Sequence, residues 1–203
     1  MYIPKHFEEK DIKKLVEFMK EFNFAVLISA YDNKPTATHL PFIIEEAGEE
    51  IILKSHMAKA NPQWQSFKCK DEVLVIFSEP HAYISPSLYD HERNVPTWNY
   101  VAVHAYGIPE LITGENEIIS LLESMFDEFE KTYKTQWDNL EADYKNKLLK
   151  GITAFKIKVN KLEGKFKLSQ NKTNEERERI INSLESSDDD IKTALADYMK
   201  KKS

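Results

Sequence analysis

The sequence is poor in the residues that cross-link or chelate. Cys69 is the only cysteine among 203 residues, so no intrachain disulfide can form and no structural zinc site can be built on cysteines. A single cysteine is typical of a protein from a reducing compartment. We therefore expect a cytoplasmic protein that depends on its hydrophobic core for stability.

Glycine is also scarce, and the short motifs of several enzyme classes are missing. Five scattered glycines exclude the Walker phosphate loop and the dinucleotide-binding fingerprint. The sequence has no HExxH and no GxSxG motif, and none of its six histidines pair at the i, i+4 spacing of a helical metal site. We therefore expect no metal, and the sequence identifies no catalytic residue.

An excess of positive charge and long apolar runs are absent as well. Lysine and arginine number 28 against 34 acidic residues, which gives a formal net charge of -6. This balance disfavours the extended phosphate-neutralising surface of non-specific nucleic-acid binding. No run of about 18 apolar residues occurs, and the start "MYIPKHFEEK" lacks the pattern of a signal peptide. We expect no membrane association.

The residues that are present predict alternating helices and strands. Apolar residues at helical spacing predict a helix over residues 8–22. Short apolar runs bounded by turn residues predict strands at 24–31, 36–44, 51–55, 72–78 and 98–107, with a further strand at 109–113. A long loop is expected at 79–97, helices around 118–129 and 137–148, a strand at 152–159 and an extended segment at 163–172. Consecutive strands with short turns favour an antiparallel barrel with packed helices, in the α+β class.

The C-terminal tail is expected to form two short helices. Thr173 and Glu176 form a capping-box pattern, and Ser187 with the acidic residues 188–190 suggests a second helix start. Two short helices could also form a DNA-reading helix-turn-helix, but a helix that begins with aspartates would repel phosphate. We expect one domain over 1–203, with helix and barrel in 1–172 and the helices of 173–203 packed on it.

The segment "SHMAKANPQW" (55–64) has the composition of an anion site. Asn61 and Pro62 are typical of a helix start, whose N–H groups and dipole attract anions. Lys59 and the hydroxyl and imidazole just before it add donors, while small alanines let a ligand approach the backbone. The alternative is an ordinary strand-to-helix connection in which Lys59 is solvated and Asn61 only caps the helix.

The segment "THLPF" (38–42) places a proline inside a predicted strand. Proline interrupts the regular ladder and leaves neighbouring backbone groups able to bond the edge of a planar heteroaromatic ring. The alternative is a strand at the edge of the sheet whose proline only limits further pairing.

Together these segments resemble a known family. In order and spacing, "MYIPKHF", "THLPF", "HMAKANPQW", "EPHAYISPSLY", "VPTWNYVAVHAYG" and "EGKFKLSQNK" are similar to the PaiB-like family of FMN-binding negative transcriptional regulators. The resemblance runs from residue 1 to about residue 184, with one departure at Leu88, where the family usually has tryptophan. It implies an FMN-binding split β-barrel, a homodimer with the flavin between subunits, and a bacterial, cytoplasmic origin.

The resemblance also implies which residues contact FMN. Lys59 would be the main partner of the phosphate, with Ser55, His56 and Asn61 beside it. The backbone of Thr38, His39, Leu40 and Pro41 would line the isoalloxazine edge. The remaining contacts would come from Trp98 and Asn99 at the border of the pocket and from Lys167, Gln170 and Asn171 across the dimer interface.

Two functions from different classes remain open. The first is a flavin-dependent regulator of transcription, for which direct DNA binding is doubtful because the sequence supplies no DNA-reading element. The second is a flavin-dependent oxidoreductase of the pyridoxamine phosphate oxidase or flavin reductase group, because a bound flavin can itself carry the redox chemistry.

Overall fold

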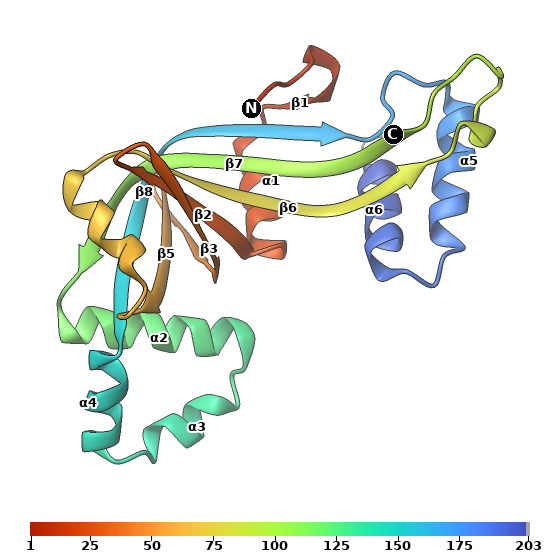
Figure 1. Cartoon of the computed structure of the whole chain (residues 1–203). Coiled ribbons are helices and arrows are strands. Elements are labelled where there is room, and N and C mark those ends of the chain that lie inside the picture. The colour runs from red at the N-terminus through yellow and green to blue at the C-terminus, as the bar shows by residue number, and fades with distance from the viewer. Residues whose placement is uncertain (202–203) are drawn as a thin grey trace. The chain divides into compact units, whose positions relative to one another are not determined.

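The computed structural model describes residues 1–201, which form two compact units. Unit 1 comprises Met1–Phe18, Phe77–His104 and the segment that begins at Glu163. Unit 2 comprises Met19–Ile76 and Ala105–Leu162. Both units draw on separated stretches of the chain (Figure 1). The expectation of one domain over the whole chain stays a prediction.

Antiparallel strands form the body of unit 2. Strand β2 (Phe24–Tyr31) pairs with β3 (Lys34–Pro41), and β4 (Ile43–Ala47) pairs with β5 (Glu50–Ala58). Alternate residues point inward, as the period of a strand requires. The fully buried inward side chains of this unit include Leu27, Leu53, Val75, Phe155 and Ile157.

The order of the strands shows why the sheet curls. The order is β3-β2-β6-β7-β8-β5-β4, with β6 spanning Val73–Ile84, β7 Thr97–Ile112 and β8 Ile152–Lys167. The two outermost strands of this order, β3 and β4, are consecutive in the chain with only Phe42 between them. The sheet must therefore curve until these two strands meet at a corner, which gives the antiparallel, barrel-like α+β fold that the sequence predicts.

Phe42 corrects one predicted strand. A single strand was expected over residues 36–44, but the structure divides it between β3 and β4. The Phe42 side chain is fully buried, and its backbone N–H donates to the carbonyl of Asn23 at 2.9 Å. Burying this aromatic ring takes the residue out of the regular ladder, so the chain turns the corner here.

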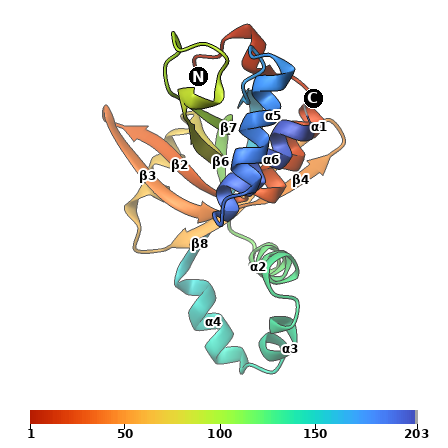
Figure 2. The same ribbon diagram turned by 90° about the vertical axis from the view of Figure 1, so that its right-hand side faces the viewer.

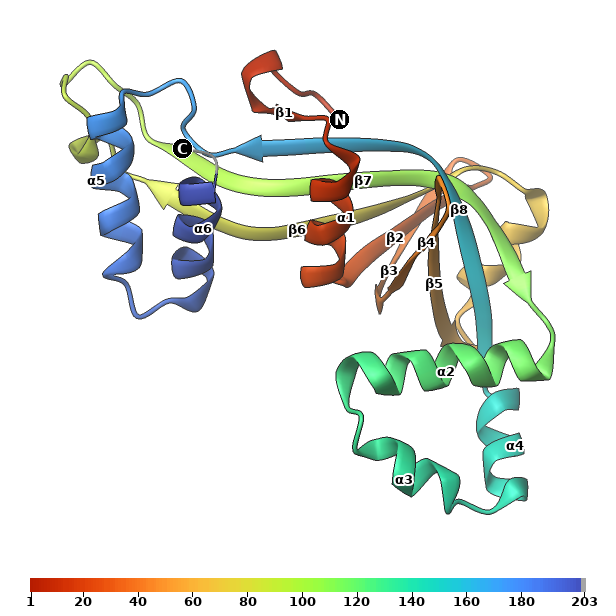
Figure 3. The same cartoon turned by 180° about the vertical axis from the view of Figure 1, so that it is seen from behind.

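Three helices form one excursion of unit 2 between β7 and β8, and Figure 3 shows them together. They are α2 (Glu115–Phe129), α3 (Tyr133–Asp138) and α4 (Ala142–Lys150). Leu121 and Met125 of α2 form a buried cluster with Ala154 of β8. The helix expected at 137–148 is thus two short helices, with a break around Asn139.

The core of unit 1 joins the two ends of the chain. The rings of Phe18, Phe166 and Tyr198 lie 5.8–6.0 Å apart, which is the normal separation of packed aromatic side chains. Phe18 belongs to α1 (Ile12–Glu21), which follows the short elements η1 (Lys5–Phe7) and β1 (Glu8–Glu9). Strand β1 pairs with β8 in antiparallel register.

The C-terminal helices pack within unit 1 rather than standing free. Helices α5 (Asn174–Glu185) and α6 (Asp190–Lys201) lie side by side (Figure 2). Ile180, Leu195 and Met199 are fully buried. The predicted capping box is present, because Thr173 and Glu176 exchange hydrogen bonds with each other's backbone N–H groups.

Several predicted strands end too early. The strands expected at 98–107 and 109–113 form the single strand β7, and β5 continues to Ala58. Strand β6 continues to Ile84 into the segment expected to be a loop, with the helical turn η3 (Pro86–Leu88) after it. Ala82 and Ile84 alternate inward, which is why the strand persists past Pro80. Strand β8 likewise continues without a break to Lys167. No helix within residues 1–201 is long and apolar enough to cross a membrane.

Candidate functional site

The helical turn after β5 begins as the sequence predicts. Element η2 (Pro62–Cys69) is a 3₁₀ helix with Pro62 in its first turn and Asn61 as its N-cap. The Asn61 side-chain oxygen accepts a hydrogen bond from the Gln63 N–H at 2.9 Å. The Asn61 amide also donates to the Thr38 hydroxyl at 2.9 Å. The cap therefore ties the start of η2 to strand β3.

Gln63 anchors this turn and was missed by the sequence reading. Its side chain is buried, and its amide nitrogen donates to the Leu27 carbonyl, the Ser29 hydroxyl and the Thr36 carbonyl at 3.1–3.2 Å. Its amide oxygen accepts from the Thr38 hydroxyl at 2.5 Å. No local pattern marks such a glutamine, because its partners lie about 25 to 36 residues away in the sequence.

Lys59 lies just before the cap and remains exposed. Its backbone N–H donates to the Gly151 carbonyl at 2.8 Å, and its carbonyl accepts from the Trp64 indole at 3.0 Å. Its ammonium nitrogen lies 5.0 Å from the centre of the Trp64 ring. Among residues 1–201, no carboxylate lies within ion-pair distance of this ammonium group.

Ser55 and His56 lie on opposite faces of β5. Ser55 is fully buried and donates to the Pro41 carbonyl at 2.7 Å, so its hydroxyl supports the corner of the sheet. His56 is half-buried, and burial lowers the pKa of its imidazole. Its Nδ1 atom is buried and has no hydrogen-bond partner in the described part of the chain. Such an atom is suited to bonding a ligand.

The residues of "THLPF" divide between the core and the surface. Leu40 is buried in the core, whereas His39 is exposed and stacks on Phe24 with ring centres 6.3 Å apart. The hydroxyl of Thr38 already bonds the η2 cluster. Side chains that could meet a ligand here are therefore few, and the backbone of residues 38–41 is the main candidate.

Trp98 and Asn99 belong to unit 1, where they point to opposite faces of β7. Trp98 is 53% exposed and forms an aromatic surface with His81 and Tyr83, whose ring centres lie 5.8 and 6.1 Å away. Asn99 is fully buried, and its amide nitrogen donates to the Ser169 hydroxyl at 2.8 Å. Asn99 therefore holds the end of β8 in place.

The predicted residues after β8 also have different roles. Lys167 donates to the Thr97 hydroxyl, and Lys167, Asn171 and Asn99 line one pocket of unit 1. Gln170 does not line it. Its side chain instead accepts from the Leu168 N–H at 2.7 Å and donates to the Phe166 carbonyl, which closes the turn. The structure thus brings together three of the five unit 1 residues that were expected to bind a ligand.

The residues at and just before the start of η2 fit an anionic group such as a phosphate. The Lys59 ammonium supplies positive charge, Asn61 fixes the turn, and the buried His56 Nδ1 atom lacks a partner. The described residues include no group of three histidine, cysteine, aspartate or glutamate side chains that could hold a metal ion. The polar groups here suit an organic anion.

Comparison with known proteins identifies this cofactor. Residues 1–161 match the family described as "Putative FMN-binding domain". The chain is 37% identical over 204 residues to the protease synthase and sporulation protein PAI 2 of Bacillus subtilis, covering 100% of this chain and 98% of that protein.

Solved structures share the fold at low sequence identity. The flavocytochrome Anf3 of Azotobacter vinelandii is 13% identical, with a TM-score of 0.63 over 81% of this chain and 72% of that one. An FAD- and haem-binding protein of Mycobacterium smegmatis is 14% identical, with a TM-score of 0.60 over 79% and 73%. The chain therefore belongs to the PaiB-like family of FMN-binding proteins, with FMN as its cofactor and a split β-barrel as its fold.

Proposed function

We propose that the FMN phosphate binds at the start of η2, against Lys59, and that the isoalloxazine edge lies along residues 38–41. The observation that carries this proposal is the exposed Lys59 ammonium, clear of carboxylates within residues 1–201, beside a turn fixed by Asn61. The helix start adds its positive dipole end at the same place. When bound, the flavin supplies the capacity to take up and release electrons.

Each neighbouring residue has a distinct part in this proposal. Lys59 pairs with the phosphate, and the neutral His56 offers Nδ1 as a hydrogen-bond acceptor or, in its other tautomer, as a donor. Ser55 acts indirectly by holding the Pro41 carbonyl. Leu40 packs in the core, so only its backbone could meet the ring.

Titration with two flavins tests the phosphate contact. A hydrogen bond to a charged group is worth about 1.5–3 kcal/mol, so Lys59→Ala should weaken FMN binding roughly ten- to a hundred-fold. Riboflavin lacks the phosphate and should lose less affinity. Lys68→Ala is the matched control, because Lys68 also lies 5.0 Å from the Trp64 ring but belongs to the last turn of η2 rather than to its start. FMN binding by Lys59→Ala at the affinity of the unaltered protein would refute the assignment.

The protein's role in the cell is a second part of the proposal. PAI 2 is named for protease synthesis and sporulation, which supports a regulatory protein of the same kind. The apolar faces of α5 and α6 are buried, and α6 begins among aspartates 188–190. Neither helix is therefore suited to read DNA. We expect a regulator that responds through its flavin and acts through another molecule.

A flavin-dependent oxidoreductase is the alternative, and two measurements separate the roles. Rapid reduction of bound FMN by a nicotinamide cofactor, with turnover of an acceptor, would favour the enzyme. Control of defined genes that is lost with the FMN site, without such turnover, would favour the regulator. A salt-dependent gel shift with a defined operator would contradict indirect action.

A homodimer completes the proposed site. The exposed aromatic surface of Trp98, His81 and Tyr83 in unit 1 offers a contact for a second copy, and Trp98 would then border that copy's flavin. Sedimentation of the FMN-loaded protein should show a dimer at micromolar concentration. A monomer would contradict this arrangement, and Trp98→Ala should weaken the dimer, whereas Tyr31→Ala in unit 2 should not.

A further inference from the structure

Unit 1 contains a pocket with two lysines and no carboxylate in its lining. Its volume is about 330 Å³. Lys167 and Lys172 supply the charge, while Phe7 and Tyr89 supply aromatic walls. The other lining residues are His6, Asn94, Val95, Thr97, Asn99, Ser169 and Asn171. The pocket thus combines positive charge, neutral hydrogen-bonding groups and flat apolar surface.

Both ammonium groups are held by neutral partners. Lys172 donates to the Asn94 side-chain oxygen at 2.8 Å and lies 3.6 Å from the centre of the Tyr89 ring. Lys167 donates to the Thr97 hydroxyl and lies 5.9 Å from the centre of the Phe7 ring. An ammonium group has three N–H donors, and each of these two ammonium groups makes one hydrogen bond within residues 1–201. Each therefore keeps donors for a ligand.

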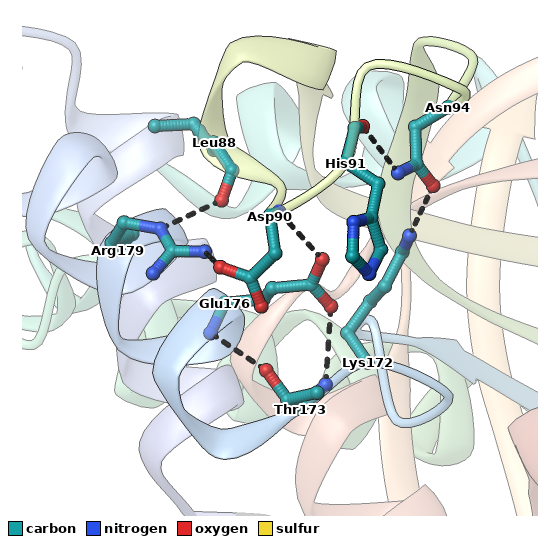
Figure 4. Close-up of polar contacts among 8 residues, drawn as sticks. All are labelled: Leu88, Asp90, His91, Asn94, Lys172, Thr173, Glu176 and Arg179. Atoms are coloured by element: carbon teal, nitrogen blue, oxygen red, sulfur yellow. Dashed lines mark hydrogen bonds and ion pairs between the residues drawn. The ribbon is translucent and has the colours of Figure 1, made fainter.

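The surrounding charges leave the pocket positive. Glu176 offsets part of the charge of Lys172, and its carboxylate also accepts hydrogen bonds from the backbone N–H groups of Asp90 and Thr173 (Figure 4). Its single negative charge leaves the two lysines with a net positive charge. Burial and the nearby Lys165 lower the pKa of Lys167. Keeping Lys167 charged beside Lys165 is thus unfavourable, and a bound anion would reduce this cost.

The wall of the pocket is fixed before any ligand arrives. Arg179 of α5 donates to the Leu88 carbonyl at 2.9 Å and pairs with Asp90 (Figure 4). Glu176 accepts from the Asp90 N–H at 3.1 Å. These bonds hold the chain on both sides of Tyr89, so the aromatic wall needs no ordering when a ligand binds.

We propose that this pocket binds a small aromatic carboxylate, whose carboxylate accepts hydrogen bonds from Lys167 and Lys172 and whose ring packs against Phe7 and Tyr89. A charged ligand without a ring would leave the apolar walls uncovered, and a neutral ring would leave the lysines unneutralised. Three lining residues, Asn99, Lys167 and Asn171, are ones that the resemblance assigned to FMN, so the variants' affinity for FMN is measured beside their affinity for the proposed ligand.

Calorimetric titration of the FMN-loaded protein with benzoate tests the pocket. Benzyl alcohol keeps the ring without the charge, and inorganic phosphate keeps the charge without the ring. Benzoate should bind at least about ten-fold more tightly than either. Lys172→Gln and Lys167→Gln should each weaken benzoate binding by roughly ten-fold or more. Lys13→Gln is the matched control, because it removes the same charge from an exposed position of unit 1 that lies outside the lining.

Each possible result of these titrations either supports the proposal or overturns it. Loss of benzoate binding in both lysine variants supports the proposal when Lys172→Gln keeps its FMN affinity and thermal midpoint and Lys13→Gln binds benzoate normally. Lys172→Arg keeps the charge and should retain binding even if Lys172→Gln perturbs the wall. Absence of benzoate binding at millimolar concentration overturns the proposal. Equal binding of benzyl alcohol also overturns it, because the pocket would then not recognise the negative charge. A loss of FMN affinity in Lys172→Gln overturns it as well, because the pocket would then bind FMN itself.

Discussion

The start of η2 and the unit 1 pocket treat their polar groups in opposite ways. At η2, the side chains of Asn61, Thr38 and Gln63 bond one another and the neighbouring backbone, and only Lys59 and the His56 Nδ1 atom are left to a ligand. In the unit 1 pocket, Lys167 and Lys172 face neutral groups and aromatic rings. At η2 the polar side chains satisfy one another and Lys59 supplies one positive charge. The unit 1 pocket holds two positive charges that its lining residues do not neutralise.

This difference separates stability from binding. A polar group that is paired and buried contributes to the free energy of unfolding, and its removal leaves its partners unsatisfied. A cation without a counter-ion contributes little to folding and can even oppose it, but it is available to a ligand. Substitutions in the two regions should therefore have different effects.

Gln63→Ala should have the largest effect on stability. It would remove hydrogen bonds to four groups of β2 and β3, some of them buried, so we expect the free energy of unfolding to fall by about 3 kcal/mol. Denaturant titration of the protein without FMN measures this. Gln65→Ala, at an exposed position of the same turn, should change it by no more than about 0.5 kcal/mol. Similar changes in the free energy of unfolding for the two variants would show that Gln63 does not anchor the turn.

Substitution of Glu176 tests whether a buried polar group next to the unit 1 pocket stabilises the folded chain, as Gln63 does at η2. Hydrogen bonds from the Asp90 and Thr173 N–H groups lower the pKa of Glu176 below its ordinary value of 4.5. The ionised carboxylate therefore stabilises the folded chain above that value, and this contribution is lost as the pH falls through the lower folded pKa. Glu176→Gln should cost about 1–2 kcal/mol at pH 7.

The pH dependence of the same variant provides the check. The difference in unfolding free energy between Glu176→Gln and the unaltered protein should be constant from pH 7 down to about 5 and shrink at lower pH. Glu175→Gln, at the exposed neighbouring position, should be nearly neutral throughout. A difference that persists unchanged to pH 2 would show that the charge of Glu176 plays no part.

Lys167→Gln should have the smallest effect on stability. It removes one hydrogen bond to Thr97 but also the repulsion from Lys165. We expect the free energy of unfolding to change by no more than about 0.5 kcal/mol in the absence of ligand. A loss as large as that of Gln63→Ala would mean that the pocket, like η2, is a scaffold, and the contrast between the two regions would fail.

The sequence predicted those parts of the fold that depend on local patterns. A short apolar run that ends at a turn predicted β2 at its observed bounds, and the Asn61–Pro62 pair predicted the start of η2. The corner at Phe42 was missed because an apolar run looks the same whether it continues a strand or ends one. The break between α3 and α4 was missed for the same reason, since apolar spacing continues across it.

For the candidate site, the sequence could suggest residues only where the residue type itself indicates a role. Lys59 and Asn61 could be chosen because a lysine before a capped turn suggests an anion site. Gln63 could not, because its partners come from distant strands. Asn99, Lys167 and Asn171 were chosen by resemblance alone, and Lys172 was overlooked because nothing in the sequence shows that it faces Tyr89.

The construction of unit 1 from both ends of the chain bears on how the protein is made. Synthesis proceeds from the N-terminus, so Phe18 emerges from the ribosome long before Phe166 and Tyr198, the rings it packs against. Until then the part of its apolar surface that these two rings cover stays open. A chain that stops before Tyr198 would keep that surface exposed to chaperones and proteases. The contact that stabilises the finished protein would thus also distinguish complete chains from unfinished ones.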